Sequence, residues 1–354
     1  SDYEQRLNKD GAVIADFAVR CAMIQQQVTR LGKKAGGQAV IDPALLELVT
    51  ALVEKPHAVL GNFDPAFLKV PQEALISSMR DHQKYFHVVD GKGALLPAFI
   101  TVSNIQSRTP ARVRTGNERV LNARLADAKF FWETDAIQPL SARTKALENV
   151  LFHHALGSLA AKTRRIEKLS AKIAQAVGAP AAACVRAASL CKADLVSGMV
   201  GEFPDLQGIM GRYLARHDGE PAAVARAIEE HYLPRYAGGA LPQSPAGQVL
   251  ALADRLDSLV GLFIAGEEPT GEKDPYGLRR AALGVIRILV EKKLDLNVAA
   301  LVEDAADGYA SDGLVSGESA KSQCATFILE RYRALYTTLG FAQDEISAVL
   351  EAGA

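Results

Sequence analysis

The segment from Ala251 to Phe263 constrains the fold more than any other part of the chain. Its apolar residues recur at Leu252, Leu256 and Leu259, which is the spacing of one face of an α-helix. Alanine and valine residues extend this face around most of the helix and leave only a narrow polar stripe. Helices that are apolar on most sides are usually buried. The segment therefore predicts a buried helix at the centre of a helical core.

Three carboxylates stand in this apolar setting and need partners. Asp254 and Asp257 lie on the polar stripe of the predicted helix, and Asp194 stands between two apolar residues in an earlier segment. A charge that is buried without a partner is costly. We therefore expect these three residues to be structural charges of the core, neutralised by cations of the protein itself.

The next predicted helix supplies candidate cations. Asp274 followed by Pro275 is a typical helix start, because Asp caps the first turn and Pro fits its first position. Arg279 and Arg280 lie within the first two turns, and we expect them to pair with the core carboxylates. The alternative is that all of these residues are ordinary solvated charges.

Size and composition indicate a soluble globular protein. The chain has 354 residues, of which 49% are hydrophobic and 23% charged, and its length suggests about two or three domains. A formal net charge of −1 argues against a simple nucleic-acid coat protein but leaves a local basic patch open. The sequence contains no run of about 18 apolar residues, so no membrane span is expected.

The cysteines and the chain ends suggest a cytosolic fragment. Cys21, Cys184, Cys191 and Cys324 are scattered without C-x-x-C spacing. This pattern favours neither a zinc ribbon nor a disulfide framework, and it is typical of the reducing cytosol. The chain opens at Ser1 without a signal-peptide pattern and stops shortly after a helical pattern. We therefore expect a piece of a longer protein.

The N-terminal part predicts a mixed α+β unit. Segments 57–63 and 84–104 are rich in β-forming residues, and D-G-K-G at 90–93 is typical of a hairpin turn. Helical patterns precede and follow these strands. Residues 108–114 are basic and contain a proline, which indicates a loop before a long helix that begins at Thr115.

From Pro139 onward the pattern is almost only helical. Residues 305–322 are small and polar, which indicates a linker or a long turn between helices. Helical patterns return at 327–339 and from Asp344.

Sequence motifs of several reaction classes are absent. The sequence contains no G-x-x-x-x-G-K-[ST], no G-x-G-x-x-G, no G-x-S-x-G and no H-E-x-x-H. ATP chemistry therefore has no recognisable phosphate cradle in this chain.

The helical part invites one metal-site interpretation. Domains of the HD class bind metal through a His, an adjacent His-Asp pair and a distant Asp. His153 or His154 could supply the first ligand and Asp254 the last. The adjacent His-Asp pair is missing, because Ala193 stands before Asp194 where this class of domain needs a His. Carboxylates without imidazole make a poor site for first-row metals, so no metal ion is expected.

A literal His-Asp pair occurs at His217 and Asp218. Gly219-Glu220-Pro221 follows it, which indicates a turn and not a core helix. A metal-dependent phosphohydrolase of the HD class is therefore kept only as an alternative function.

Five long motifs carry a resemblance to a known family. They are H-Q-K-Y-F at 82–86, G-N-E-R-V-L-N-A-R-L-A-D-A-K-F-F at 116–131, K-A-D-L-V-S-G-M-V-G-E-F-P-D-L-Q-G at 192–208, A-L-A-D-R-L-D-S-L-V-G at 251–261 and D-P-Y-G-L-R-R-A-A-L-G-V-I-R-I at 274–288. In these motifs, which run in order over nearly the whole chain, the sequence resembles the beta subunit of bacterial heterotetrameric glycyl-tRNA synthetase. None of them is a generic fold signature, so the resemblance is specific.

The resemblance implies a domain organisation. Residues 1–138 would form an α+β module like the B3/B4 module of the phenylalanine enzyme. Residues 139–300 would form a degenerate, all-α HD-like domain. Residues 301–354 would begin a helical linker that leads to an anticodon-binding domain absent from this chain.

The resemblance also implies a function and partners. The family's enzyme is a cytoplasmic α2β2 assembly that attaches glycine to tRNA(Gly) with ATP, and its active site belongs to the alpha subunit. ATP and Mg are therefore expected at the alpha subunit, and this chain is expected to have no catalytic residue and no cofactor. Its expected partners are the alpha subunit and tRNA(Gly), without a membrane. The chain alone should not aminoacylate.

The most cationic predicted helix then gains a role. It carries Lys162, Arg164, Arg165 and Lys168. Such a basic face is more often solvated than functional, but under the resemblance these residues become candidate phosphate contacts to tRNA. Several cations on one face give RNA affinity that depends on salt and not on sequence.

Arg279 and Arg280 have two interpretations under the resemblance. They would either reach tRNA or pair with the core carboxylates, and we favour the pairing because their helix looks buried. A purely structural scaffold that holds the alpha dimer is a further alternative to tRNA binding.

Overall fold

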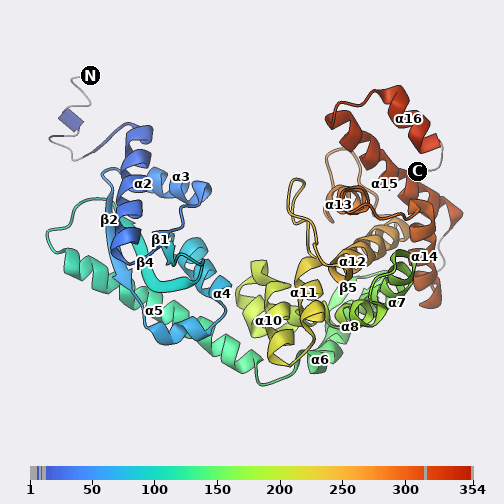
Figure 1. The fold of residues 1–354 in the computed structure, drawn as a ribbon, viewed down its shortest axis with the longest axis horizontal. Helices are drawn as coiled ribbons and strands as arrows, with labels where there is room; N and C mark the ends of the chain where they lie inside the picture. Colours follow the sequence, from blue (N-terminus) through green and yellow to red (C-terminus); the bar gives the residue numbers. More distant parts are fainter. Residues whose placement is uncertain (1–5, 8, 10–12, 315–316, 352–354) are drawn as a thin grey trace. The chain divides into compact units, whose positions relative to one another are not determined.

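The computed structural model describes residues 6–7, 9, 13–314 and 317–351 of the chain. The chain divides into two compact units, Ser1–Thr134 and Asp135–Ala354. A small antiparallel sheet with helices forms the first unit, and the second is built mainly from helices (Figure 1). The prediction of an α+β part followed by a helical part is confirmed at this level.

The first unit is built around a four-stranded antiparallel sheet in the order β1-β3-β4-β2. The strands are β1 (Gln38–Ala39), β2 (His57–Asn62), β3 (Phe86–Val89) and β4 (Leu95–Ser103). The predicted hairpin joins β3 to β4. In its turn the Asp90 carboxylate accepts the N–H groups of Lys92 and Ala94 at 2.8 and 2.9 Å. Gly93 adopts φ +82°, a conformation that favours glycine.

Helices cover and extend this sheet. They are α2 (Phe17–Lys34), α3 (Pro43–Leu52), α4 (Gln72–Ser77) and α5 (Pro110–Asp135), with helical turns η1 (Pro65–Lys69) and η2 (Ser78–His82). Helix α2 contacts α3 and strands β1, β2 and β4. Ile24 and Val28 of α2 and Val49 of α3 form one apolar cluster with Phe86 and Ile100 of the sheet. This shared cluster is the core of the first unit.

Helix α5 begins earlier than the sequence predicts. Its first residue is Pro110, so the expected loop at 108–114 is wrong for most of its length. Proline is tolerated in the first turn of a helix, because the N–H group that it lacks has no partner there. The proline therefore marks the start of the helix and not an interruption before it.

The second unit contains the remaining elements. They are α6 (Leu140–Arg143), η3 (Thr144–Asn149), β5 (Leu151–His153), β6 (Gly157–Ser158), α7 (Leu159–Val177), α8 (Ala181–Leu190), η4 (Ala193–Val196), α9 (Gly198–Glu202), η5 (Pro204–Leu206), α10 (Ile209–His217), α11 (Ala222–Glu230), α12 (Pro245–Ile264), α13 (Leu278–Glu291), α14 (Val298–Ser311), α15 (Glu318–Thr338) and α16 (Gln343–Glu351).

Helix α12 is the centre of the second unit, as its sequence predicts. It packs against α7, α8, α11, α13, α14 and α15. Leu252, Leu256 and Leu259 are fully buried. The helix begins with a capping Ser244, whose side chain accepts the N–H of Gly247, and with Pro245 in the first turn. The apolar circumference of α12 is thus explained by neighbours on most of its sides.

A short hairpin interrupts the helical part where the sequence predicts only helix. Strands β5 and β6 pair antiparallel, with Leu151 opposite Ser158 and His153 opposite Gly157. Gly157 adopts φ +86°. The apolar residues around position 151 therefore belong to an extended segment that ends where Ser158 caps α7.

Helix α13 begins at Leu278 and not at Asp274, which corrects the predicted start. The Asp274 carboxylate still caps the helix, because it accepts the N–H groups of Leu278 and Arg279 at 2.8 and 2.9 Å. Gly277, with φ +66°, lies between the cap and the first turn. Asp274 thus acts from outside the helix, across a turn.

The linker expected at 305–322 is largely helical. Helix α14 continues to Ser311 and α15 begins at Glu318. Both helices pack against α12. Leu301, Val302 and Ala305 of α14 and Cys324 and Ile328 of α15 are buried. The described residues of this segment therefore belong largely to two packed helices.

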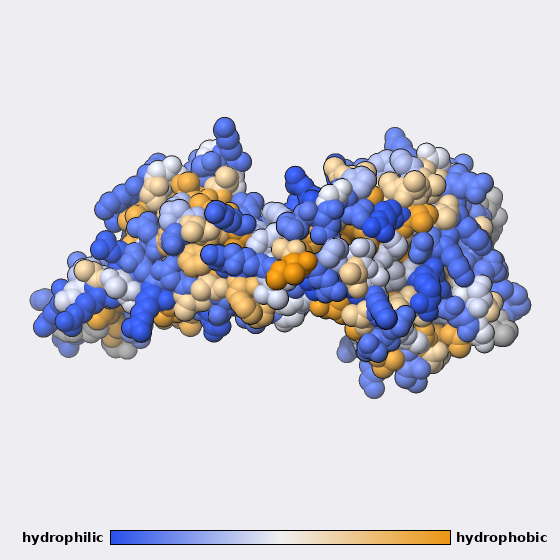
Figure 2. Space-filling view, turned by 90° about the horizontal axis from the view of Figure 1, so that it is seen from below, coloured by the Kyte–Doolittle hydropathy of each residue, from blue (hydrophilic) through white to orange (hydrophobic). Residues whose placement is uncertain are grey.

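On the face in Figure 2, hydrophilic residues predominate and apolar residues gather only in small groups. Within the described ranges, no helix combines the length and the apolar character that crossing a bilayer requires.

Candidate functional site

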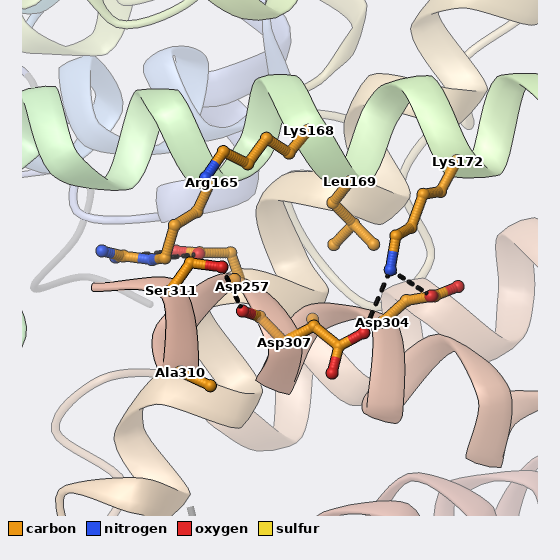
Figure 3. Close-up of a pocket in the computed structure, with 11 residues that line it drawn as sticks. Arg165, Lys168, Leu169, Lys172, Asp257, Asp304, Asp307, Ala310 and Ser311 are labelled. Carbon is orange, nitrogen blue, oxygen red and sulfur yellow. Dashed lines mark hydrogen bonds and ion pairs between the residues drawn. The ribbon is translucent and has the colours of Figure 1, made fainter. Parts of the chain in front are cut away.

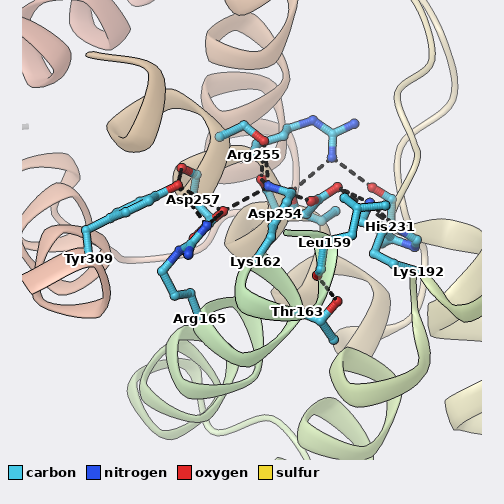
Figure 4. A network of polar contacts seen from close by, with 12 residues as sticks. Leu159, Lys162, Thr163, Arg165, Lys192, His231, Asp254, Arg255, Asp257 and Tyr309 are labelled. Atoms are coloured by element: carbon cyan, nitrogen blue, oxygen red, sulfur yellow. Dashed lines mark hydrogen bonds and ion pairs between the residues drawn. The ribbon is translucent and has the colours of Figure 1, made fainter. Parts of the chain in front are cut away.

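A buried network of charges joins α7 to α12 in the second unit (Figure 4). Arg165 Nε donates to Asp257 Oδ1 at 2.7 Å, and Lys162 Nζ donates to Asp257 Oδ2 at 3.0 Å. These three residues are between 1% and 3% exposed. Burial would lower the pKa of Arg165, but the Asp257 carboxylate outweighs it and holds that pKa above its ordinary value. Asp257 is therefore a core carboxylate held by two protein cations.

Asp254 is held by two ammonium groups. Lys192 Nζ lies 2.8 Å from Asp254 Oδ2, and Lys162 Nζ lies 3.2 Å from Asp254 Oδ1. Burial would raise the pKa of Asp254, but the charges of Lys192 and Lys162 outweigh it and hold that pKa well below its ordinary value. Asp254 therefore carries its negative charge inside the core.

The same Lys192 ammonium contacts an imidazole. Lys192 Nζ lies 3.0 Å from His231 Nε2. Burial and the charge of Lys192 hold the pKa of His231 well below its ordinary value, so this imidazole is neutral. Its Nδ1–H donates to the Ile228 carbonyl at 2.6 Å, which leaves Nε2 as the acceptor for Lys192. Lys192 thus connects a neutral imidazole to a charged carboxylate.

This arrangement does not fit a metal ion. A metal needs the lone pairs of imidazole and carboxylate, and here Lys192 occupies those of His231 and Asp254. Within the described part of the chain, no three His, Cys, Asp or Glu side chains gather as a metal site requires. His153 lies elsewhere, with its contacts to His154, Glu267 and Tyr276. The histidine that reaches Asp254 is therefore His231, which the sequence pattern does not single out.

Asp194 has a different kind of partner from the one expected. Its side chain is fully buried, and its Oδ2 accepts the N–H groups of Gly208 and Gly211 at 2.6 and 3.1 Å. Burial raises the pKa of this carboxyl to about 6, although these N–H groups act in the opposite direction. Asp194 therefore fastens the start of α10 to η4 through backbone donors, not through an arginine.

Tyr309 extends the network to α14. Its hydroxyl donates to the Asp257 carbonyl at 2.7 Å and accepts from Arg165 Nη2 at 3.2 Å. The Arg165 guanidinium also lies over the Tyr309 ring, 4.0 Å from its centroid. Arg165 Nη1 donates to Asp312 Oδ2 at 2.9 Å. Arg165 is therefore the residue at which α7, α12 and α14 meet.

The predicted cationic face of α7 is corrected in part. Lys162 and Arg165 are buried and paired within the protein, so they do not present their charges to a phosphate. The sequence contains a signal for this, because Lys162 takes a position in the apolar repeat of Leu159, Ile166 and Leu169. Arg164 and Lys168 are exposed, as expected.

A hollow of about 590 Å³ lies between α7 and α14 (Figure 3). Lys168 and Lys172 line it from α7, and Asp304 and Asp307 from α14. Lys172 Nζ donates to Asp304 at 2.6 Å and to Asp307 at 3.1 Å. The charges of this hollow are thus largely matched within the protein, which gives a ligand little to bind.

Arg279 and Arg280 do not pair with the core carboxylates, so the favoured interpretation is wrong. Arg279 Nη2 donates to the Gly271 carbonyl at 2.6 Å. Arg280 forms no hydrogen bond or ion pair with any residue of the described ranges, and it lines a second hollow. The first turn of α13 is therefore a surface feature, and Lys162, Arg165 and Lys192 take the role expected of its arginines.

The literal His-Asp pair lies at the end of α10. His217 is the last residue of helix α10, and Asp218 is the C-cap that begins the turn, so the prediction of a turn is confirmed for Asp218 but not for His217. Asp218 Oδ2 accepts the N–H of Leu140 at 2.6 Å, which gives this carboxylate a structural contact to α6.

The whole chain is similar to the members of one known family. The family described as "Glycyl-tRNA synthetase beta subunit" matches residues 1–351. A protein of Hahella chejuensis called "Glycine--tRNA ligase beta subunit" is 48% identical over 350 residues, which are 99% of this chain and 50% of that protein. Proteins with the same name from Chromohalobacter salexigens and Ectopseudomonas mendocina are 49% and 50% identical, over 98% and 95% of this chain. The chain spans about half the length of these curated relatives.

Proposed function

The chain belongs to the glycyl-tRNA synthetase beta subunit family, and we propose that it contributes tRNA binding and assembly to the attachment of glycine to tRNA(Gly). In this proposal the alpha subunit is its partner, holds the active site and binds ATP and Mg. The assembly works in the cytoplasm. The beta subunit name of the relatives supports the partner, since such a name presupposes another subunit.

We assign finer domains on the same basis. Residues 1–138 are proposed as a B3/B4-like module, 139–300 as a degenerate HD-like domain, and 301–354 as the beginning of a helical linker. The position of Lys192 between His231 and Asp254 supports a domain without a working metal site, because its ammonium group contacts the imidazole and carboxylate atoms that could otherwise bind a metal ion.

The observation that carries the proposal is the internal pairing of the core charges. Asp254 and Asp257 are bound by Lys162, Arg165 and Lys192, so they stabilise the helical core and activate no water or phosphate. This favours an architectural and RNA-binding role over a metal-dependent phosphohydrolase. A stoichiometric transition metal in the purified chain, together with phosphodiesterase activity, would reverse this preference.

Exposed cations carry the proposed contact to RNA. Arg164 and Lys168 are exposed on α7, and in the first turn of α13 Arg280 is exposed and Arg279 is partly exposed. Arginine and lysine bind phosphates, and each contact makes the affinity more dependent on salt. These four residues replace the set expected from the sequence, which includes the buried Lys162 and Arg165.

The proposal is tested with the double variant R164A/K168A of the chain. We expect this variant to bind tRNA(Gly) more weakly. The slope of log affinity against log salt should fall by about 1 for each phosphate group that the variant no longer binds. Lys172→Ala on the same helix is the matched control, because its ammonium group is already bound by Asp304 and Asp307.

A different outcome would favour the scaffold. If tRNA(Gly) binds the double variant with unchanged affinity and slope while the chain still co-migrates with the alpha subunit, the helix is not part of an RNA surface. The chain would then serve assembly alone.

A further inference from the structure

A second hollow in the helical unit is lined by three arginines. Its volume is about 500 Å³, and Arg235, Arg255 and Arg280 contribute to its wall from the segment after α11, from α12 and from α13. We call it the arginine hollow. Arg255 belongs to its buried part, since this side chain is enclosed by the backbone of residues 231–234.

None of these guanidinium groups is neutralised by a carboxylate of the described ranges. Arg255 donates to the carbonyls of His231 and Ala251 at 2.9 Å and more weakly to two others. Arg235 donates to the carbonyls of Asp205 and Gln207 at 3.2 and 2.9 Å. Arg280 donates to nothing within the part of the chain that the structure describes. Carbonyl dipoles orient a guanidinium group but leave its charge uncompensated.

The carboxylates of the hollow, Asp205 and Asp254, offset only part of the charge of the three arginines. Asp254 lines it but is already bound to Lys192 and Lys162. Asp205 is exposed, and its carboxylate forms no ion pair with a residue of the described ranges. The hollow therefore keeps a net positive wall, unlike the hollow beside α7, where Asp304 and Asp307 bind Lys172.

The like charges act on one another. Burial lowers the pKa of Arg255 to about 10; the charge of Asp254 opposes this shift, and the positive charge of Arg280 adds a smaller effect in the same direction as burial. The protein thus keeps Arg255 and Arg280 close enough for repulsion. An anion placed between them would remove that repulsion and would gain charge-assisted hydrogen bonds.

We propose that the arginine hollow binds a phosphate group, with Arg280 and Arg235 as its hydrogen-bond donors and Arg255 as a fixed positive charge behind it. No described residue accepts an N–H group of Arg280, and Arg235 has several N–H groups beyond the two given to carbonyls. Arg255 donates through both Nη atoms to four carbonyls, so it acts through its charge. The planar fork of arginine matches the oxygens of a phosphate better than a lysine does.

The phosphate can come from an RNA or from a free nucleotide, and the chemistry of the site is the same. The inference rests on the proposed function only if the source is RNA. Two kinds of probe separate the sources: inorganic phosphate and adenosine monophosphate by calorimetry, and tRNA(Gly) by filter binding, each with the 354-residue chain.

Arg280→Ala is the decisive variant, because Arg280 is exposed and bonded to no described residue, so the fold should tolerate its loss. We expect at least one class of probe to bind about tenfold more weakly, the reduction typical of removing one charge-assisted hydrogen bond. Arg280→Lys should recover only part of the affinity, because the charge stays and the planar fork does not. Arg216→Ala is the matched control, an exposed arginine of the same unit outside the hollow.

The outcomes distinguish this inference from the proposed function. A weaker response of the small probes assigns the site to a free phosphate ligand, and a weaker response of tRNA alone assigns it to RNA. If neither class distinguishes R280A from R216A, the arginine hollow is not a phosphate site, even where R164A/K168A weakens tRNA binding. If tRNA does not bind at all but R280A weakens binding of the small probes, the arginine hollow is a phosphate site and the proposed tRNA-binding function is wrong.

Discussion

Lys192 shows how a single side chain decides what this core can do. Its ammonium group lies between the charged Asp254 and the neutral His231, and all three depend on one another. Without Lys192, the carboxylate would lose its nearest cation and the imidazole its donor. The residue therefore turns a pair of potential metal ligands into a structural contact.

Asp194 carries a pH dependence of its own. Its pKa is raised from 3.8 to about 6 by burial, so between these values the folded state binds the proton more tightly than the unfolded state. Stability contributed by this protonation is present below pH 3.8 and is lost as the pH rises to about 6. The charged form is thus the less stable one in this position.

Asp194→Asn isolates this effect. The amide does not titrate, and its oxygen can accept the N–H groups of Gly208 and Gly211. We expect the free energy of unfolding of the wild type, minus that of the variant, to fall by up to about 3 kcal/mol as pH rises through this window. Urea unfolding at several pH values measures it, and a difference that stays constant with pH would refute the assignment.

At the scale of the elements, close packing at α10 explains one glycine. A Cβ atom on Gly211 would lie 2.6 Å from Ile228 Cγ2 of α11 and 3.1 Å from Asp194 Oδ2. Both distances are too short for an unstrained contact. The glycine therefore allows α10 to approach α11 and lets its own N–H reach Asp194.

Gly211→Ala should destabilise the second unit by about 1–3 kcal/mol, because overpacking forces its neighbours to move. Gly201→Ala in α9 is the control, since a Cβ atom there meets nothing within 4 Å; alanine should be neutral or slightly stabilising in that helix. Chemical denaturation of both variants compares them. Equal effects would mean that the contact between α10 and α11 is not tight.

The elements also show how far sequence reasoning reaches. The burial of α12 and the hairpin between β3 and β4 follow from periodicity and turn residues, which are local properties. The lysine and arginine partners of Asp254 and Asp257 lie 62 to 95 residues away, and local periodicity does not say which helices cross. Sequence reasoning therefore selects the nearby arginines, and not Lys162, as partners of the core carboxylates. The position of Lys162 in an apolar repeat nevertheless indicates that this lysine is buried.

At the scale of the whole chain, the charge network unites segments that the sequence assigns to different regions. Arg165 of α7 binds Asp257 of α12, and Tyr309 and Asp312 join from the region expected to begin a linker. Residues 135–354 form one compact unit accordingly. The formal net charge of −1 does not reveal that charges are paired in the core while Arg280, at the surface, pairs with none of the described residues.

We infer that cations of the protein itself stabilise the buried carboxylates of α12. A double-mutant cycle on Arg165 and Asp257 tests it most directly, using urea unfolding of R165M, D257L and the double variant. We expect R165M to cost about 3–5 kcal/mol, because it removes one of the two buried cations that hold Asp257 and leaves that carboxylate with Lys162 alone. The double variant should cost less than the sum of the single ones by about 2 kcal/mol or more. If the two effects add to within about 0.5 kcal/mol, Arg165 and Asp257 do not stabilise each other, and this arginine does not hold the buried carboxylate.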